Sequence, residues 1–290
     1  AAQYDGYSSN SWENQLKIED LFLKHIDKTS FKKHLQKLTE RPHVVGSKTN
    51  EEVIRYIGEV MNEAGLDVIN YPYDVYLPKH PGSSLIEIVT PSRQVLNQKE
   101  DIISDDPFTK DSLLWKGWNA FSGSGDVTAE IVYANYGRKE DFETLKELGV
   151  DIKGKIVIAR YGGNFRGYKA KFAEANGAAG LIIYTDPKDS GFARGLVYPE
   201  GPYYNESTIQ RGSLLTTDFT GDPLTPFEPA LPLDGKKKIK RLDPNEAQLH
   251  TIPVTPIGYG EAEKILGQMK GVVVPQSWQG GLPFTYRLDG

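Results

Sequence analysis

The stretch Lys155-Ile-Val-Ile-Ala-Arg-Tyr-Gly-Gly-Asn-Phe-Arg-Gly167 decides the fold class of this chain. Residues 156–158 form a short apolar run bounded by turn residues, which is typical of a buried strand. Residues 170–176 predict a helix that ends at Gly177, and residues 181–184 predict a second buried strand. This strand, loop, helix, strand order predicts an α/β unit.

Arg166 lies on the first loop of this predicted unit, between glycine-rich turns. The ends of strands are where α/β folds present groups to a ligand. The same spacing also fits a surface arginine that pairs with a carboxylate. The local pattern therefore leaves two interpretations of Arg166 open.

Periodicity and turn residues predict the remaining elements. They are a helix capped by Ser30, a helix from Thr49 to Gly65, strands at 85–90, 130–133 and 251–257, and helices at 140–148 and 261–269 ahead of a polar tail. Pro78–Gly82 marks the expected domain boundary, which gives domains 1–77 and 78–290. The stretch 186–232 has no sustained periodicity, and loops of that length tend to be functional.

Composition indicates a globular protein of about two domains, since the chain has 290 residues, 38% of them hydrophobic. The net charge of −5 and the single basic cluster at 236–241 argue against a nucleic-acid partner. Cysteine is absent, so thiol catalysis and disulfides are excluded. No apolar run approaches the roughly 20 residues of a membrane span. Asn205-Glu-Ser207 is a glycosylation sequon, relevant only in a secreted eukaryotic protein.

Three local patterns imitate metal ligands, and a simpler interpretation is favoured for each. His25-Ile-Asp27 lies in a lysine-rich helical segment, and Glu51-Glu52 fits the first turn of a helix, where carboxylates are stabilising. His43 follows a proline turn and fits a hydrogen-bonded loop histidine. No Gly-x-Ser-x-Gly elbow is present either. The residues therefore predict no catalytic site within this chain.

A series of motifs in the same order carries a family resemblance. They are Leu38–Gly46, Val132–Phe142, Gly154–Gly162, Phe165–Gly167, Gln210–Gly212, Gly221–Pro226 and Ile252–Tyr259. The sequence resembles the front half of the glutamate carboxypeptidase (N-acetylated-α-linked acidic dipeptidase) family of zinc peptidases. The resemblance implies a helical and strand segment of the peptidase domain, then a protease-associated (PA, or apical) domain with a sandwich or barrel-like core and flanking helices, whose final residues return to the peptidase domain.

The resemblance also implies roles for particular residues. Arg166 matches the arginine that grips the α-carboxylate of the substrate's C-terminal residue, and Ser213 stands where glutamate-preferring members have asparagine. Thr225 and Glu228 match positions at a structural calcium site, although Glu228 replaces a tyrosine. The two zinc ions of the family are bound by sequence outside this chain, so the chain alone is expected to be inactive.

We therefore expect the substrate-recognition part of a zinc carboxypeptidase that acts on small peptides. The resemblance suggests an acidic C-terminal residue, and Ser213 leaves that preference open. The resemblance implies an extracytoplasmic location, a homodimer and a further polypeptide segment that completes the enzyme. One alternative is a non-catalytic binding protein like the transferrin receptor, whose type lacks the Phe165–Gly167 motif. Another is a protein-binding PA module, against which the helical residues 1–76 argue.

Overall fold

The structure, a computed structural model, describes residues 6–290. It divides the chain into two compact units, Ala1–Val68 and Ile69–Gly290. The division falls shortly before Pro78, where the sequence predicts the boundary between domains 1–77 and 78–290. That domain boundary stays a prediction.

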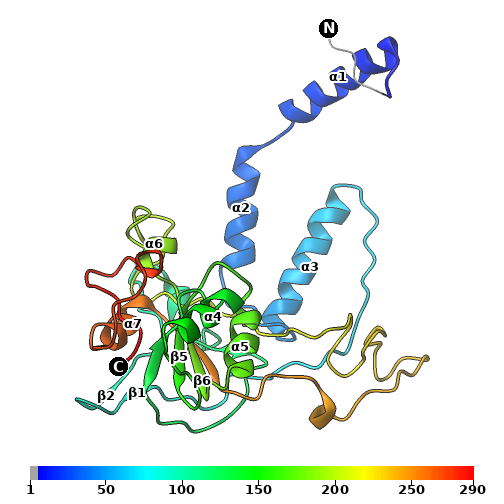
Figure 1. Cartoon of the computed structure of the whole chain (residues 1–290). Helices are drawn as coiled ribbons and strands as arrows, with labels where there is room; N and C mark the ends of the chain where they lie inside the picture. The colour runs from blue at the N-terminus through cyan, green and yellow to red at the C-terminus, as the bar shows by residue number, and fades with distance from the viewer. Residues whose placement is uncertain (1–5) are drawn as a thin grey trace. The chain divides into compact units, whose positions relative to one another are not determined.

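The first unit contains three helices, α1 (Ser9–Lys24), α2 (Lys28–Thr39) and α3 (Lys48–Glu63) (Figure 1). Asp27 caps α2 and Ser47 caps α3, each through a side-chain oxygen that accepts a backbone N–H of the first turn. The prediction that Ser30 caps its helix is therefore wrong, and α3 begins one residue before the predicted start at Thr49. Both lie inside the first turn, where the earlier residue has already taken the free N–H.

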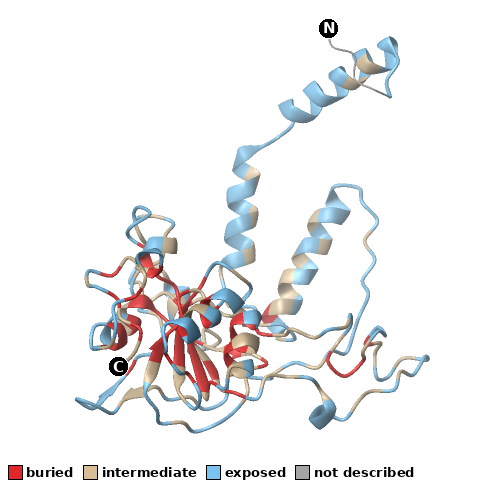
Figure 2. Cartoon of the chain, in the orientation of Figure 1, coloured by how far each residue is buried: buried red, intermediate tan, exposed pale blue. Residues whose placement is uncertain are grey.

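The described part of the first unit buries no apolar side chain, as its pale blue and tan colours in Figure 2 show. Phe22, Phe31 and Leu35 are 69%, 66% and 64% exposed, and Met61 on the apolar stripe of α3 is 44% exposed. Helices of this kind are normally stabilised by packing of their apolar face. In the described part of this unit, every apolar side chain stays at least partly exposed.

The second unit is built around a four-stranded parallel sheet in the order β4-β5-β6-β8. These strands are β4 (Ile131–Tyr133), β5 (Ile156–Arg160), β6 (Gly180–Tyr184) and β8 (Val254–Ile257). The α/β class predicted from the sequence is confirmed. The core that the resemblance describes as a sandwich or barrel is seen here as this one parallel sheet, together with two small two-stranded sheets.

The helices α4 (Lys139–Glu147), α5 (Arg166–Ala175) and α7 (Tyr259–Leu266) follow β4, β5 and β8. In Figure 1, α4 and α5 lie over the sheet, and α5 packs against both α4 and β6.

Helix α5 begins at Arg166, four residues before the predicted start at Ala170. The prediction that placed Arg166 on the loop is therefore wrong. Glycine is a poor helix former, so Gly167 gives no helix signal at this position. It is needed for packing, since a Cβ on Gly167 would lie 2.3 Å from the carbonyl oxygen of Leu214.

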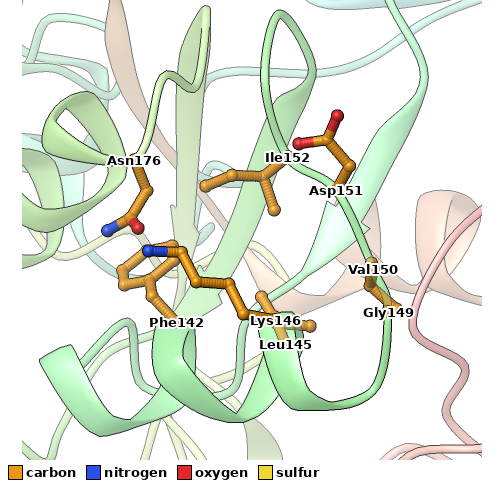
Figure 3. A pocket seen from close by; sticks show the side chains of 8 residues that line it. All are labelled: Phe142, Leu145, Lys146, Gly149, Val150, Asp151, Ile152 and Asn176. Carbon is orange, nitrogen blue, oxygen red and sulfur yellow. The ribbon is translucent and has the colours of Figure 1, made fainter.

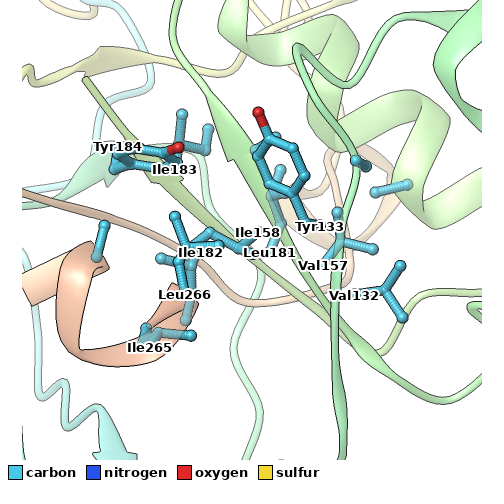
Figure 4. Close-up of a cluster of buried hydrophobic side chains, with 14 of the residues drawn as sticks. Val132, Tyr133, Val157, Ile158, Leu181, Ile182, Ile183, Tyr184, Ile265 and Leu266 are labelled. Atoms are coloured by element: carbon cyan, nitrogen blue, oxygen red, sulfur yellow. The ribbon is translucent and has the colours of Figure 1, made fainter. Parts of the chain in front are cut away.

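The hydrophobic core lies on the parallel sheet (Figure 4). Val132, Val157, Ile158 and Ile183 lie on neighbouring strands and are 0% exposed, and Leu266 of α7 is 1% exposed. Strands covered on both faces are apolar at consecutive positions, without alternation. This explains why the short runs in the sequence predicted them correctly.

The polar tail predicted after Met269 is wrong, because its apolar residues enter the core of the second unit. Trp278, Leu282, Tyr286 and Leu288 are buried there. The N–H of Tyr133 donates to the carbonyl of Leu288 at 2.8 Å, so the tail runs along β4. The return of the final residues to a peptidase domain stays a prediction.

Short elements complete the second unit. They are β1 (Glu87–Ile88) paired with β2 (Gln94–Val95), β3 (Asn119–Ala120) paired with β7 (Gly212–Ser213), α6 (Pro187–Ser190), and the 3-10 helices η1 (Pro107–Lys110), η2 (Pro244–Glu246) and η3 (Gln276–Trp278). Two of them, α6 and β7, lie in the stretch that the sequence left without structure. Among residues 6–290, no helix is both long and apolar enough to cross a bilayer.

Candidate functional site

The candidate site lies where the parallel strands β4, β5 and β6 end. Their carboxyl ends meet at one edge of the sheet because β4, β5 and β6 pair in parallel, with Tyr133 opposite Ile158 and Arg160 opposite Tyr184. In α/β sheets this edge is the usual place for a ligand. The loop after β5 carries the chain into α5 and so brings Arg166 to this edge.

Arg166 is partly buried and occupies the first turn of α5. Its Nη1 donates to the carbonyl oxygen of Ser213 at 3.4 Å, and its Nη2 donates to Oε1 of Gln210 at 3.3 Å. Its Nε is buried and has no hydrogen-bond partner. The rings of Phe165 and Tyr161 lie 5.4 Å and 5.9 Å from its Cζ atom.

All described partners of the Arg166 guanidinium are therefore neutral. Among residues 6–290, no carboxylate pairs with it, so the surface ion pair left open by the sequence is not formed here. The charge of Arg166 remains available to an anion, and the positive end of the α5 dipole adds to the same field.

Ser213 lies beside Arg166, but its side chain does not contact the guanidinium in the bonds described. The contact is made by the backbone carbonyl, while the Ser213 hydroxyl accepts the N–H of Leu215 at 3.0 Å. The structure thus brings together the two residues that the resemblance assigns to substrate binding. Gln210 is a third member that sequence reasoning did not single out.

A second cation, Arg160, lies buried at the end of β5. Its side chain is 1% exposed, its Nη2 donates to Oδ1 of Asn135 at 2.7 Å, and Asp189 lies 3.3 Å from Nη1. The ring of Tyr136 stacks under it at 4.1 Å. Burial alone would lower the pKa of Arg160, but Tyr133 and Asp189 raise it above its usual range, so this residue stays charged.

Tyr136 also donates its hydroxyl to Asp189 at 2.7 Å. Burial, followed by this bond, raises the pKa of Tyr136 to about 12. Asp189 therefore holds both Arg160 and Tyr136 and uses its charge internally. This cluster is structural, and it fixes the loops after β4 and β6 around the edge.

Lys169, one turn after Arg166 on α5, is fully buried. Its Nζ donates to the carbonyls of Tyr136 and Gly162 at 2.5 Å and 2.7 Å, and to Oδ1 of Asn164 at 2.6 Å. Burial lowers its pKa to about 7. Lys169 thus connects the loop after β4 with the loop that leads to Arg166.

The calcium candidates lie in a separate turn. Thr225 is 1% exposed and its Oγ1 is buried with no partner, while Glu228 is exposed and donates its N–H to the Thr225 carbonyl at 3.2 Å. The carbonyls of both residues face Gly221, where a Cβ would lie 2.6 Å and 3.1 Å from them. The orphaned hydroxyl and the clustered carbonyls are oxygen donors of the type that calcium prefers.

The sequon residue Asn205 is engaged in its own turn. Its Oδ1 accepts the N–H groups of Ser207 and Thr208 at 3.1 Å and 3.0 Å, and its Nδ2 donates to the carbonyl of Tyr198 at 3.2 Å. The use of Asn205 as a glycosylation site stays a prediction.

Two hollows lie on the second unit. One, of about 230 Å³, lies between the end of α4 and the start of β5, with Lys146 and Asp151 at its rim (Figure 3). It is at the amino ends of the strands and therefore away from Arg166. The other, of about 570 Å³, is lined in part by Tyr76, Asn119 and Phe121. Asn119 connects this second hollow to the site, because its Nδ2 donates to the hydroxyl of Tyr161 at 3.2 Å.

Within residues 6–290, no group of three or more histidine, aspartate or glutamate side chains is arranged to hold a metal ion. A catalytic zinc needs about three protein ligands at one place. The described residues therefore do not fit such an ion, and we assign no hydrolytic step to them.

Comparison with known proteins places this site in a family context. The PA domain family matches residues 127–217, which include β4, β5, β6 and Arg166. A glutamate carboxypeptidase 2 homolog from Caenorhabditis briggsae is 36% identical over 277 residues, which are 91% of this chain and 35% of that protein. An aminopeptidase NAALADL1 from Rattus norvegicus is 32% identical over 97% of this chain and 38% of its own length.

Residues 127–217 are thus a PA domain. Most of the chain is similar to a glutamate carboxypeptidase 2 homolog and to an aminopeptidase, and the resemblance predicted from the motifs is confirmed. The chain spans about a third of the length of these relatives. A solved aminopeptidase from Aneurinibacillus sp. strain AM-1 aligns with 84% of this chain and 42% of its own, at 18% identity and a TM-score of 0.36, and adds no argument.

Proposed function

We propose that this chain forms the substrate-recognition part of a zinc-dependent exopeptidase, and that Arg166 binds the free C-terminal carboxylate of a peptide. The observation that carries this proposal is a partly buried guanidinium with only neutral partners at the carboxyl edge of the sheet. A planar guanidinium donates two parallel hydrogen bonds to a carboxylate. The activity of the complete protein is then that of a carboxypeptidase acting on small peptides.

Ser213 bears on which C-terminal residue is removed. Its hydroxyl offers one donor and is shorter than the asparagine that the family resemblance places there, so it reaches less far toward an acidic side chain. We propose carboxylate recognition through Arg166 and leave the preference for an acidic residue to experiment.

In this proposal, the two catalytic zinc ions and the general base come from polypeptide outside this chain. A zinc ion supplies an activated water for attack on the peptide bond. The exposed apolar residues of α1, α2 and α3 support a further segment that covers the first unit. Domains 1–77 and 78–290, a calcium ion at Thr225 and Glu228, a homodimer and an extracytoplasmic location belong to the same proposal.

The names of the relatives favour a second candidate, an aminopeptidase, because one of the relatives bears that name. Peptide pairs separate the two activities in the full-length polypeptide that contains residues 1–290. A carboxypeptidase cleaves an N-acetylated peptide with a free C-terminus, whereas an aminopeptidase cleaves a C-amidated peptide with a free amino group. Cleavage of only the second peptide would contradict the carboxylate role.

The residue test is Arg166→Ala, with Arg194→Ala as a control at an exposed arginine of the same unit. Loss of a desolvated carboxylate pair costs about 2–5 kcal/mol, so kcat/KM on the free acid should fall by well over tenfold. Activity on the amidated peptide should change much less, because this peptide has no C-terminal carboxylate to pair with Arg166. An equal loss on both peptides would refute the proposal.

A further inference from the structure

The Arg166 guanidinium rests on the backbone of β7. A Cβ on Gly212 would lie 2.4 Å from Nη1 and 2.6 Å from Cζ of Arg166, so only glycine leaves room for the guanidinium there. Gln210 and Ser213 flank Gly212 and accept the two Nη groups. We call these three residues, Gln210, Gly212 and Ser213, the seat of Arg166.

The seat is fixed from its other side. Arg211 donates to both carboxylate oxygens of Glu100, at 2.5 Å and 2.8 Å, and also to the carbonyl of Trp115. The hydroxyl of Tyr161 donates to the carbonyl of Gln210 at 2.8 Å. The carboxylate of Glu100 neutralises the charge of Arg211. Together with the bonds to Trp115 and from Tyr161, this ion pair connects the seat to neighbouring loops.

The two bonds to Arg166 are long for N–H···O bonds, whose usual length is about 2.9 Å. They orient the guanidinium without neutralising it, because an amide oxygen and a carbonyl oxygen carry no charge. A glutamate at position 210 would have nearly the same shape and would neutralise Arg166. The neutral amide of Gln210 is therefore the feature that keeps the arginine both oriented and available.

We propose that Gln210 is a positioning residue for carboxylate recognition, and that Gly212 provides the space in which Arg166 is aimed. The inference rests on the proposed function, since it concerns the same arginine. It adds the requirement that a neutral hydrogen-bond acceptor at position 210 sets both the orientation and the free charge of Arg166.

The first test reads the orientation of Arg166 in this chain, without any activity. The probe is phenylglyoxal, which modifies exposed arginines, and the rate at Arg166 is followed by mass spectrometry. Gln210→Ala should raise this rate about threefold to tenfold, the factor expected for one lost hydrogen bond. Gln210→Glu should lower it, because an ion pair protects the guanidinium. Gln268→Glu, at an exposed glutamine just after the end of α7, should leave this rate unchanged.

Gly212→Ala tests the space for the guanidinium. The added methyl should displace Arg166 and raise its modification rate, and ¹⁵N spectra of the arginine side chains should show a moved Arg166 signal, assigned from its loss in Arg166→Lys. Gly154→Ala is the matched control, because Gly154 has a positive φ of +72° but open space around its Cβ position. It should destabilise the chain and leave the Arg166 signal in place.

The second test uses the full-length polypeptide and the acid and amide peptides. Gln210→Glu should raise KM for the free acid about tenfold or more and leave kcat and the amide nearly unchanged. Unchanged modification rates and signals of Arg166 in both Gln210→Ala and Gly212→Ala would refute the proposal that these residues position Arg166. If the rates and signals change while Arg166→Ala affects both peptides equally, the positioning role is supported and the proposed function is refuted.

Discussion

Replacement of Lys169 by methionine tests how the loop before Arg166 is held. Methionine has a similar length and no charge, so Lys169→Met removes the three hydrogen bonds to Tyr136, Gly162 and Asn164 while filling the space. A buried acceptor that loses its donor costs about 1–3 kcal/mol. The variant also removes a buried charge, whose pKa shift from 10.5 to about 7 corresponds to a cost of about 5 kcal/mol for the ammonium.

These two effects oppose each other, and their balance depends on pH. Because the pKa of Lys169 is about 7 in the folded chain and 10.5 in the unfolded chain, the unfolded chain binds more protons between these values. The free energy of unfolding of the wild type should therefore rise from pH 7 to pH 10, by up to about 1.4 kcal/mol per pH unit. In Lys169→Met this contribution should be absent.

The assay is urea unfolding followed by tryptophan fluorescence at several pH values, for the wild type and the variant. At pH 9 the variant should be less stable by about 2–4 kcal/mol, and the difference should shrink toward pH 6 because the wild type then carries the penalty of its buried charge. The three acceptors around Nζ favour the ammonium and act against burial. A difference between the two proteins that does not change with pH would show that Lys169 stays charged and would refute this reasoning.

Three further outcomes are expected. Tyr286→Phe removes the 2.5 Å hydrogen bond from the Tyr286 hydroxyl to buried Asp186. Thermal unfolding should show a loss of stability of about 1–3 kcal/mol, while the modification rate of Arg166 stays the same. An unchanged melting temperature would contradict the view that this bond anchors the tail. The purified chain should not retain stoichiometric zinc after dialysis, because the described residues offer no three-ligand group, and atomic absorption measures this directly. Amide hydrogens of α1 to α3 should exchange rapidly in the isolated chain, and slow exchange there would contradict the need for a covering segment.

The sheet could be predicted because its strands are buried on both faces. Residues 156–158 and 181–184 are apolar at consecutive positions, and this run is visible without any alignment. The tail at 272–288 follows a different rule. Its buried residues are separated by glycine, proline and polar residues, and its backbone pairs with β4 without forming a strand of its own. No helical or strand period marks such a segment, so the sequence predicted a polar tail.

The buried cations could not be predicted from residue type, because lysine and arginine are usually exposed. The sequence contains one signal for Arg160, because this residue directly follows the apolar run 156–159. It therefore lies at the end of a buried strand, where its side chain is 1% exposed. The signal for burial of Lys169 is weaker. Lys169 is next to Ala170 on α5, and both residues belong to the buried side of this helix. The partners of Arg160 come from the segments that follow β4 and β6, whereas for Lys169 only Tyr136 comes from the loop after another strand. The parallel register of the strands brings these distant groups to one edge.

The seat of Arg166 shows where sequence reasoning reaches its limit. Arg166 and Gln210 are 44 residues apart in the sequence. The nearest strand to Gln210 is β7, which pairs with β3 in a separate sheet and has only two residues, too few for a periodic pattern. The sequence shows Gln210–Gly212 only as one motif of the family resemblance, which assigns a role to Ser213, the residue that follows it. The structure adds a physical reason for each motif position: Gln210 accepts from the guanidinium, Arg211 is taken up by Glu100, and Gly212 leaves the space. A neutral seat under a charged arginine favours an anionic ligand. Gln210→Glu adds a negative charge beside the guanidinium, so this explanation requires that the variant bind a carboxylate more weakly.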